Sequence, residues 1–211
     1  MSEEVKPVEL IKLDLGCGQN KQPGFLGVDI APTKDADFVQ NLFEFPWQWK
    51  DNEVGEVFAS HFFEHVPAKI RFQFMDELWR ILKPCGCVKE CPTQTVNGII
   101  ASTPCPEPGG SIKFITPYFM NMRAYQDPTH EWPPITDASY LYFNKEWRKS
   151  NKLDHYNVKC DFNFSTGYGL DGEVMNRSAL TQGFWFRHYW HAISDLHCTL
   201  VKRGNKEAKL C

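Results

Sequence analysis

The sequence predicts one α/β domain with a mostly parallel sheet, and three observations lead to this prediction. Apolar runs of strand length alternate with turn residues over residues 10–60. A glycine turn directly follows the first run, an order found at the ligand-binding edge of open α/β sheets. A segment with apolar residues at helical spacing then precedes a further strand. At 211 residues, the chain is long enough for a single well-buried domain.

The strands of the parallel part are expected at residues 10–15, 25–30, 36–41, 55–60 and 111–116. Only about seven residues separate the turn at Gly18 from the second strand. A parallel crossover usually takes about a dozen residues or more. The helix normally found in this position is therefore expected to be absent or reduced to one turn.

A helix is expected to begin at Pro67 and to end before Lys83-Pro84, because apolar residues recur between them at helical spacing. Asp137 is expected to cap a second helix that runs through Phe143. Residues 156–164 and 192–202 alternate enough to be antiparallel strands that complete the sheet. A glycine-rich and then aromatic-rich connection, 167–190, is expected between them.

Composition excludes several classes of protein. The net charge of −3 and the absence of a Lys/Arg run disfavour a nucleic-acid partner. No apolar stretch approaches the roughly 18 residues that span a bilayer, so no membrane association is expected. The first residues do not resemble a signal peptide, so a cytoplasmic location is expected. The eight cysteines are then expected to be reduced.

The glycine turn and the acid that follows it suggest a nucleotide-like ligand. Gly16 and Gly18 allow the backbone to approach a ligand, and Asp29 at the next strand end can accept hydrogen bonds from two ribose hydroxyls. Lys21 occupies the position where a dinucleotide-binding turn has its third glycine, which disfavours NAD and FAD. A tight structural turn with an exposed Asp29 is the alternative.

The segments that follow in order resemble class I S-adenosylmethionine-dependent methyltransferases over roughly residues 10–120. The matching segments are Leu13–Gly18, Gly27–Ile30, Asp37–Leu42 with Pro46-Trp47, Val57–Ser60 with Glu64-His65-Val66, and Glu77–Pro84. Gly24-Phe25 with Val28-Asp29 is similar to a bacterial and phage branch that has a very short link between the first two strands.

The resemblance implies a Rossmann-like methyltransferase sheet, mostly parallel with an antiparallel C-terminal strand and with helices on both faces. It also implies S-adenosylmethionine as the cofactor. The cofactor-binding residues carried over from the motifs are Asp14, Gly16, Cys17, Gly18, Asp29, Ile30, Asn41, Leu42 and Ser60. Asn41 stands where the family often has Asp, and its amide oxygen can still accept a hydrogen bond from an amino group.

An insertion at about 85–108 interrupts the Lys-Pro-Gly-Gly sequence typical of the family, since Lys83-Pro84 and Gly109-Gly110 flank it. Four of the eight cysteines lie in it, namely Cys85, Cys87, Cys91 and Cys105. Four thiolates in a short segment suggest a structural zinc site, although the spacing is looser than in paired Cys-x2-Cys motifs. Reduced cysteines in a loop are the alternative.

Candidate catalytic residues lie where the strand ends converge and in an aromatic-rich lid or acceptor region at about 117–150. His130 and Asp127, in Gln-Asp-Pro-Thr-His, are the first candidates to line the acceptor pocket, and His65 is the next. Alternatively, Asp127 caps backbone amides in a turn, His130 only packs, and His65 is structural.

The sequence therefore predicts methyl transfer from S-adenosylmethionine to an unidentified acceptor. A small molecule, a glycan-linked group or a protein is favoured over duplex DNA, because Ser60-His-Phe-Phe stands where amino-methylating DNA enzymes carry Asp/Asn-Pro-Pro-aromatic. A methyltransferase-like protein that only binds the cofactor or a partner is the alternative. A nicotinamide-dependent oxidoreductase is a third and weaker one. The oligomeric state is left open.

Overall fold

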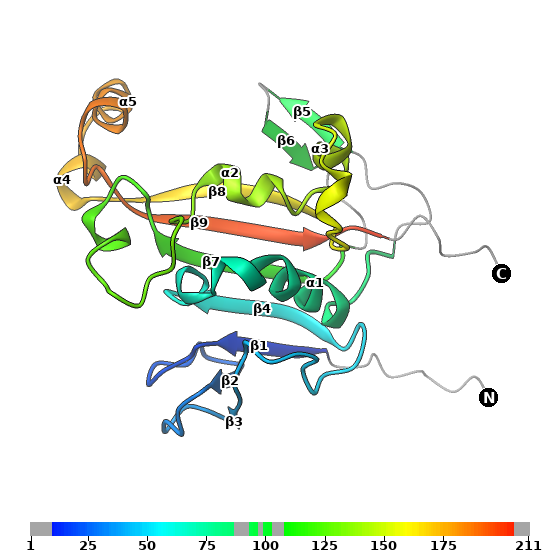
Figure 1. Cartoon of the computed structure of the whole chain (residues 1–211). Helices are drawn as coiled ribbons and strands as arrows, with labels where there is room; N and C mark the ends of the chain where they lie inside the picture. The colour runs from blue at the N-terminus through cyan, green and yellow to red at the C-terminus, as the bar shows by residue number, and fades with distance from the viewer. Residues whose placement is uncertain (1–9, 87–92, 97–98, 103–107, 205–211) are drawn as a thin grey trace, which may run out of the picture.

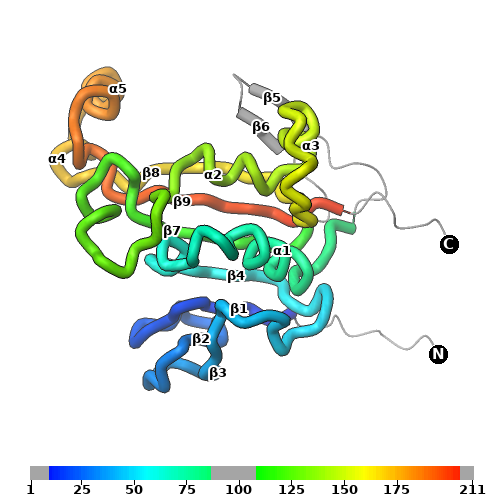
Figure 2. The backbone as a smooth tube through the Cα atoms, viewed as in Figure 1, coloured from blue at the N-terminus to red at the C-terminus, as the bar shows by residue number. Residues whose placement is uncertain are grey.

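The computed structural model describes residues 10–86, 93–96, 99–102 and 108–204. A seven-stranded main sheet runs through it in the order β3-β2-β1-β4-β7-β9-β8, with the described helices around it (Figures 1 and 2). Its strands are β1 Ile11–Leu15, β2 Leu26–Asp29, β3 Phe38–Val39, β4 Val54–Ser60, β7 Ser111–Pro117, β8 Phe162–Leu170 and β9 Ile193–Lys202. β9 is antiparallel to both of its neighbours, and the other pairs of neighbouring strands are parallel. The predicted fold class is confirmed.

The connection from β1 to β2 is direct, as the short spacing predicts. Residues 16–25 form turns and contain no helix. The backbone N–H groups of Gly16 and Cys17 donate to the carbonyl oxygen of Val28, at 2.8 and 3.3 Å. These bonds fold the turn back onto the end of β2, so the glycine turn and Asp29 lie at the same edge of the sheet.

The described helices are short, apart from α1 and α5. They are η1 Phe63–His65, η2 Ala68–Ile70, α1 Arg71–Ile81, η3 Met122–Ala124, α2 Asp137–Leu141, α3 Lys145–Ser150, η4 Asp154–Tyr156, α4 Gly172–Met175 and α5 Ala179–His188. The helix expected from Pro67 thus begins as a 3-10 turn and becomes α-helical at Arg71. The N-cap of α2 is Thr136 rather than Asp137, and the Thr136 N–H donates to Ser139 Oγ.

The C-terminal strands differ from the prediction in one respect. β9 lies where expected, but β8 begins at Phe162 and extends to Leu170, whereas 156–164 was predicted. Pairing along the whole of β9 keeps Gly167 and Gly169 in a strand, although glycine disfavours strands locally. The predicted connection 167–190 therefore holds the end of β8 together with α4 and α5.

The insertion includes a two-stranded antiparallel sheet, β5 Thr93–Val96 and β6 Ile99–Ser102, that is separate from the main sheet (Figure 1). The residues that flank the insertion lie side by side. The Gly110 N–H donates to the Lys83 carbonyl oxygen at 2.9 Å. A Cβ on Gly109 would overlap the Lys202 carbonyl oxygen, so this close approach of backbones requires glycine.

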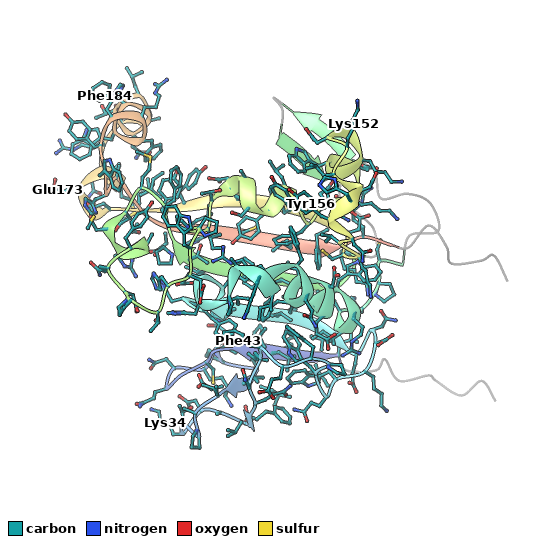
Figure 3. All side chains as sticks on the ribbon, in the orientation of Figure 1. Lys34, Phe43, Lys152, Tyr156, Glu173 and Phe184 are labelled. Atoms are coloured by element: carbon teal, nitrogen blue, oxygen red, sulfur yellow. The ribbon has the colours of Figure 1, made fainter. Side chains whose placement is uncertain are left out.

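The core packs one face of the sheet against η1, α1 and α2. Phe63 is fully enclosed and stacks on Phe114 of β7, with ring centroids 4.6 Å apart. Helix α5 contrasts with this core, because no residue in it is buried and Leu180 is 85% exposed. Figure 3 shows α5, with Phe184, standing away from the sheet. Among the described residues, no helix is both long and apolar enough to cross a membrane.

Candidate functional site

A pocket of about 280 Å³ lies at the carboxyl ends of β1 and β2. It is lined by Gly16, Asp29, Ile30, Gln40, Asn41, Leu42, Phe43, Phe62 and His65. Gly16, Asp29, Ile30, Asn41 and Leu42 are predicted cofactor-binding residues, and His65 is a predicted catalytic residue. Gln40, Phe43 and Phe62 also line the pocket and were not among the predicted cofactor-binding residues. Phe43 and Phe62 stack on each other, with centroids 6.1 Å apart, and give the pocket an apolar wall.

Asp29 shapes the pocket floor through hydrogen bonds to the backbone. Its Oδ2 accepts from the Gly18 N–H and its Oδ1 from the Ala31 N–H, both at 2.9 Å. The carboxylate thus ties the glycine turn to the end of β2. An ionised carboxylate has about four acceptor positions, so two remain for a ligand.

Both the backbone conformation at Gly16 and the nearby Phe62 ring require a glycine at this position. Its φ is +67°, a backbone conformation that residues with a Cβ rarely adopt. A Cβ at this position would overlap the ring of Phe62. At Gly18, with φ of +53°, a Cβ would meet open space. Glycine is therefore required at position 16 by both the positive φ and the Phe62 ring, and at position 18 by the positive φ alone.

Of the predicted cofactor-binding residues, Asp14, Cys17, Gly18 and Ser60 are not among those that line the pocket. Asp14 is buried and accepts a hydrogen bond from the Gln22 N–H at 2.7 Å, and its burial raises the pKa of its carboxyl. The Cys17 thiol contacts the carbonyl oxygens of Gly18 and Asp35, and burial raises its pKa to about 11. Asp14 and Cys17 therefore stabilise the turn through backbone contacts. Ser60 is the last residue of β4.

The loop after β3 forms the other wall of the pocket. Asn41 Oδ1 accepts from the Phe43 N–H at 3.0 Å, and Asn41 Nδ2 donates to Glu44 at 2.9 Å. The Asn41 amide therefore closes a tight turn that presents Leu42 and Phe43 to the pocket. The indole N–H of Trp47 donates to the Leu42 carbonyl oxygen at 3.2 Å and fixes the same turn from the core side.

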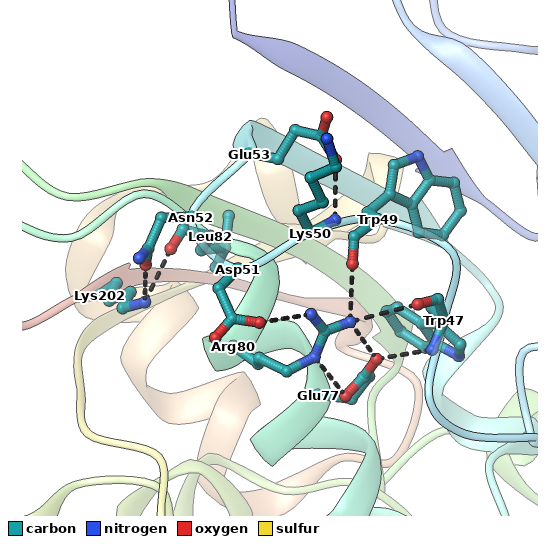
Figure 4. Close-up of polar contacts among 10 residues, drawn as sticks. All are labelled: Trp47, Trp49, Lys50, Asp51, Asn52, Glu53, Glu77, Arg80, Leu82 and Lys202. Carbon is teal, nitrogen blue, oxygen red and sulfur yellow. Dashed lines mark hydrogen bonds and ion pairs between the residues drawn. The ribbon is translucent and has the colours of Figure 1, made fainter.

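A partly buried ionic network ties this loop to helix α1 (Figure 4). Glu77 Oε1 accepts from the Trp47 N–H at 2.7 Å. Arg80 donates to both oxygens of Glu77, to Asp51 and to the carbonyl oxygens of Trp47 and Trp49. Side chains of α1 thereby hold residues 47–51 in place, directly after the loop that lines the pocket.

The predicted catalytic residues His65, Asp127 and His130 lie close together, and of the three His65 lines the pocket. His65 Nδ1 lies 3.2 Å from the Thr129 carbonyl oxygen and 3.0 Å from Thr129 Oγ1. Thr129 donates through its N–H and its hydroxyl to Asp127 Oδ1, and these bonds lower the pKa of Asp127. The rings of His65 and His130 are 4.8 Å apart and nearly perpendicular. Asp127 therefore fixes the turn, and His65 lies between that turn and the pocket.

Glu64, next to His65, is a functional candidate that the sequence analysis did not single out. It is 4% exposed, and its backbone carbonyl accepts from the Glu131 N–H at 2.9 Å. The signal available in the sequence is the pair Glu64-His65, four residues after the end of β4.

The predicted four-cysteine zinc site remains a prediction. Cys85 is buried shortly after α1. Cys87, Cys91 and Cys105 lie outside the described residues.

Comparisons with solved structures support the assignment of the fold. No protein-family model matches the chain, and no curated protein matches its sequence. A methyltransferase described as SAM-dependent, from Archaeoglobus fulgidus, aligns over 92% of this chain and 86% of its own, with TM-score 0.55 and 14% identity. This chain has the fold of SAM-dependent methyltransferases.

A second solved structure has the same fold. It is a chain from the Haloferax volcanii complex between the Trm112 methyltransferase activator and a protein described as a methyltransferase. The alignment covers 95% of this chain and 86% of that one, with TM-score 0.51 and 17% identity. At such identities the likeness concerns the fold, so the chemistry must be argued from the pocket itself.

Proposed function

We propose that this protein transfers a methyl group from S-adenosylmethionine, and that it belongs to the bacterial and phage branch with the short first connection. The observation that carries the proposal is the pocket at the carboxyl ends of β1 and β2, where Gly16, Asp29 and Asn41 converge. In open α/β sheets, ligands bind at this edge. The direct passage from β1 to β2 supports the choice of branch.

The residues present fit an adenosyl group without phosphates. Asp29 keeps two acceptor positions for ribose hydroxyls. Leu42, Phe43 and Phe62 offer apolar surface to an adenine ring. The volume of about 280 Å³ is close to the lower limit of about 300 Å³ for small-molecule pockets, which suits the adenosyl part of the cofactor.

The acceptor is proposed to approach at the His65 end of the pocket. S-adenosylmethionine supplies an electrophilic methyl group, and the protein must hold the acceptor in line with it. Asp127 and Thr129 orient His65, and His130 packs against its ring. His65 and His130 can thus hydrogen-bond the acceptor and receive its proton, with Asp127 as the residue that positions them.

The proposed acceptor is a small molecule, a glycan-linked group or a protein side chain. Duplex DNA is disfavoured by the net charge of −3, because phosphate contacts supply much of the affinity for DNA.

Calorimetric titration of the full chain with S-adenosylhomocysteine tests the cofactor, and release of S-adenosylhomocysteine from S-adenosylmethionine over an acceptor panel tests turnover. Binding together with turnover supports a methyltransferase. Binding without turnover on any acceptor favours a cofactor-binding protein instead. Absence of binding refutes the proposal.

A further inference from the structure

Glu64 is a buried carboxylate whose oxygens accept no hydrogen bond from the described residues. The residue is 4% exposed, and neither Oε1 nor Oε2 has a donor within hydrogen-bond geometry. His61 Nδ1 lies 3.4 Å from Oε1 but makes no hydrogen bond to it. A buried carboxylate without compensation destabilises the folded state, so a cation is expected to contact Glu64.

Arg71 carries a positive charge near Glu64, but it uses its hydrogen-bond donors for other partners. Arg71 interacts electrostatically with Glu64, yet its guanidinium donates to the carbonyl oxygens of Val66, Glu131 and Pro133. The bonds to Glu131 and Pro133 hold the loop after η3 against the start of α1. Arg71 therefore does not supply the hydrogen bonds that the Glu64 carboxylate lacks.

Two imidazoles lie close to Glu64, and the Nδ1 of each is near a backbone carbonyl oxygen. His65 Nδ1 lies 3.2 Å from the Thr129 carbonyl oxygen, and His130 Nδ1 lies 3.2 Å from the Ala124 carbonyl oxygen. Because a carbonyl oxygen only accepts, each Nδ1 carries the hydrogen. Each neutral ring then has its lone pair on Nε2. A backbone carbonyl that holds one ring nitrogen is the usual support of a histidine bound to a metal.

We propose that Glu64, His65 and His130 bind a divalent transition-metal ion. One ligating atom from each residue lies within 4.8 Å of the others. Two histidines and one carboxylate suit ions such as Zn²⁺, Fe²⁺ or Co²⁺ and leave coordination positions open. The positive charge compensates Glu64, which hydrogen bonding within the described residues does not do.

The position of the site relates the ion to the proposed function. His65 lines the pocket, so an ion bound to its ring lies at the acceptor end. Its open positions suit an oxygen or nitrogen of the acceptor, which would be oriented by coordination. This part of the inference rests on the proposed methyl transfer, and it makes His65 and His130 ligands rather than proton acceptors. Metal binding itself does not depend on that function.

Titration of the tag-free full chain with Co²⁺, followed by visible absorption and by calorimetry, tests the site. We expect one N/O-type site, with weak visible bands and no intense near-ultraviolet thiolate band. Thiolate ligation would produce such a band, so the titration is repeated on a chain with Cys85, Cys87, Cys91 and Cys105 replaced by serine. The N/O-type signal is expected to persist in that chain.

Substitution of the ligands completes the test. Glu64→Gln and His130→Asn should each weaken Co²⁺ binding at least tenfold and abolish the thermal stabilisation that Co²⁺ gives. His155→Asn, on an exposed turn, is the matched control and should bind Co²⁺ as the unmodified protein does. Unchanged Co²⁺ affinity in a folded Glu64→Gln or His130→Asn chain would overturn the site. So would a signal that disappears with the cysteines.

Titration with S-adenosylhomocysteine separates this result from the proposed function. A chain that binds Co²⁺ but not S-adenosylhomocysteine keeps the metal site and loses the methyltransferase proposal. A chain that binds S-adenosylhomocysteine but not Co²⁺ leaves His65 and His130 as proton acceptors and refutes the metal site.

Discussion

Asp29 combines a structural and a proposed binding role in a single carboxylate. It holds the N–H groups of Gly18 and Ala31, and it lines the pocket. An isolated acid at a strand end could have been a surface residue, which was the alternative left open by the sequence. Its two backbone hydrogen bonds show that it orders the turn.

Asp29→Ala should weaken S-adenosylhomocysteine binding by about 1–3 kcal/mol, because charge-assisted hydrogen bonds to the ribose are lost. Calorimetric titration measures this change, and circular dichroism checks that the variant is folded. Asp35→Ala is the matched control, since Asp35 is near the same turn but does not line the pocket. Equal affinities of the two variants would contradict the ribose role.

The two glycines of the turn should respond differently to substitution. Gly18→Ala should cost about 1–2 kcal/mol of unfolding free energy, from its positive φ alone. Gly16→Ala has the same backbone cost and must also displace the Phe62 ring, so its loss should be larger. Urea unfolding of both variants provides the comparison. Equal losses would mean that Phe62 moves aside freely.

At this scale, the sequence predicts the residues that belong to a linear motif and misses those that reach the pocket from elsewhere. Gly16 and Asp29 follow from their position at strand ends. Phe62 and Phe43 resemble ordinary core residues, because only the packing of the turn against β4 reveals that they form a wall. Glu64 was missed because burial without a donor is a three-dimensional property.

The loop after β3 depends on helix α1 for its position. Arg80 and Glu77 hold the backbone of residues 47–51, and Asn41 closes the turn that precedes them. The resemblance placed Glu77 and Arg80 in a family motif without a physical reason. The structure provides that reason, because the ion pair extends the order of the helix to the pocket wall.

Arg80→Met should lower the unfolding free energy by about 2–3 kcal/mol, because Glu77 is left buried without its partner. It should also weaken S-adenosylhomocysteine binding, since the pocket loop loses its anchor. Urea unfolding and calorimetry measure the two effects. Arg177→Met, on the exposed turn between α4 and α5, should change neither. A destabilised Arg80→Met with full affinity would show that the loop keeps its shape independently.

Elements whose pattern is local were predicted more accurately than those set by distant pairing. β4 and α1 were predicted from the spacing of their apolar residues, and the ends of the helix from Pro67 and Pro84. β8 was predicted at residues 156–164 but spans Phe162–Leu170. Gly167 and Gly169 are typical of a loop, and only their pairing with β9 keeps them in a strand. Helices α4 and α5 were missed for a related reason: no buried face produces a helical pattern in α5.

At the scale of the whole molecule, the core buries two thiols, Cys198 in β9 and Cys160 just before β8. Cys160 and Cys198 are fully buried, and burial holds the pKa of each thiol well above its usual value. Both are free thiols in the structure. Their protonated state is therefore coupled to the folded state.

The unfolding free energy should fall as the pH rises above about 8.5, where thiols of the unfolded chain ionise. Above that pH, the folded state binds more protons than the unfolded state, so the slope of stability with pH is negative. Each thiol should contribute about 1–2 kcal/mol between pH 8.5 and 10. Burial lowers the pKa of Lys202 to about 8, which acts in the opposite direction.

Urea unfolding at pH 7.5–10 of the unmodified chain and of Cys160→Ala/Cys198→Ala measures the contribution of the thiols. The contribution of Lys202 is common to both chains and cancels in the difference. The double variant should be less stable at neutral pH and should lose less stability as the pH rises. Parallel curves would show that these thiols ionise equally in both states.

The hydrogen bond between Gly110 and Lys83 makes the junction of the insertion a permissive position for protein engineering. The sheet holds the two flanking backbones together whatever lies between them, so the length of the intervening chain is not fixed by the fold. Doubling the length of such a loop costs only about 0.6 kcal/mol of closure entropy. A reporter domain grafted between Pro84 and Gly109 would therefore be attached at the end of the sheet opposite the pocket, where its presence need not disturb ligand binding.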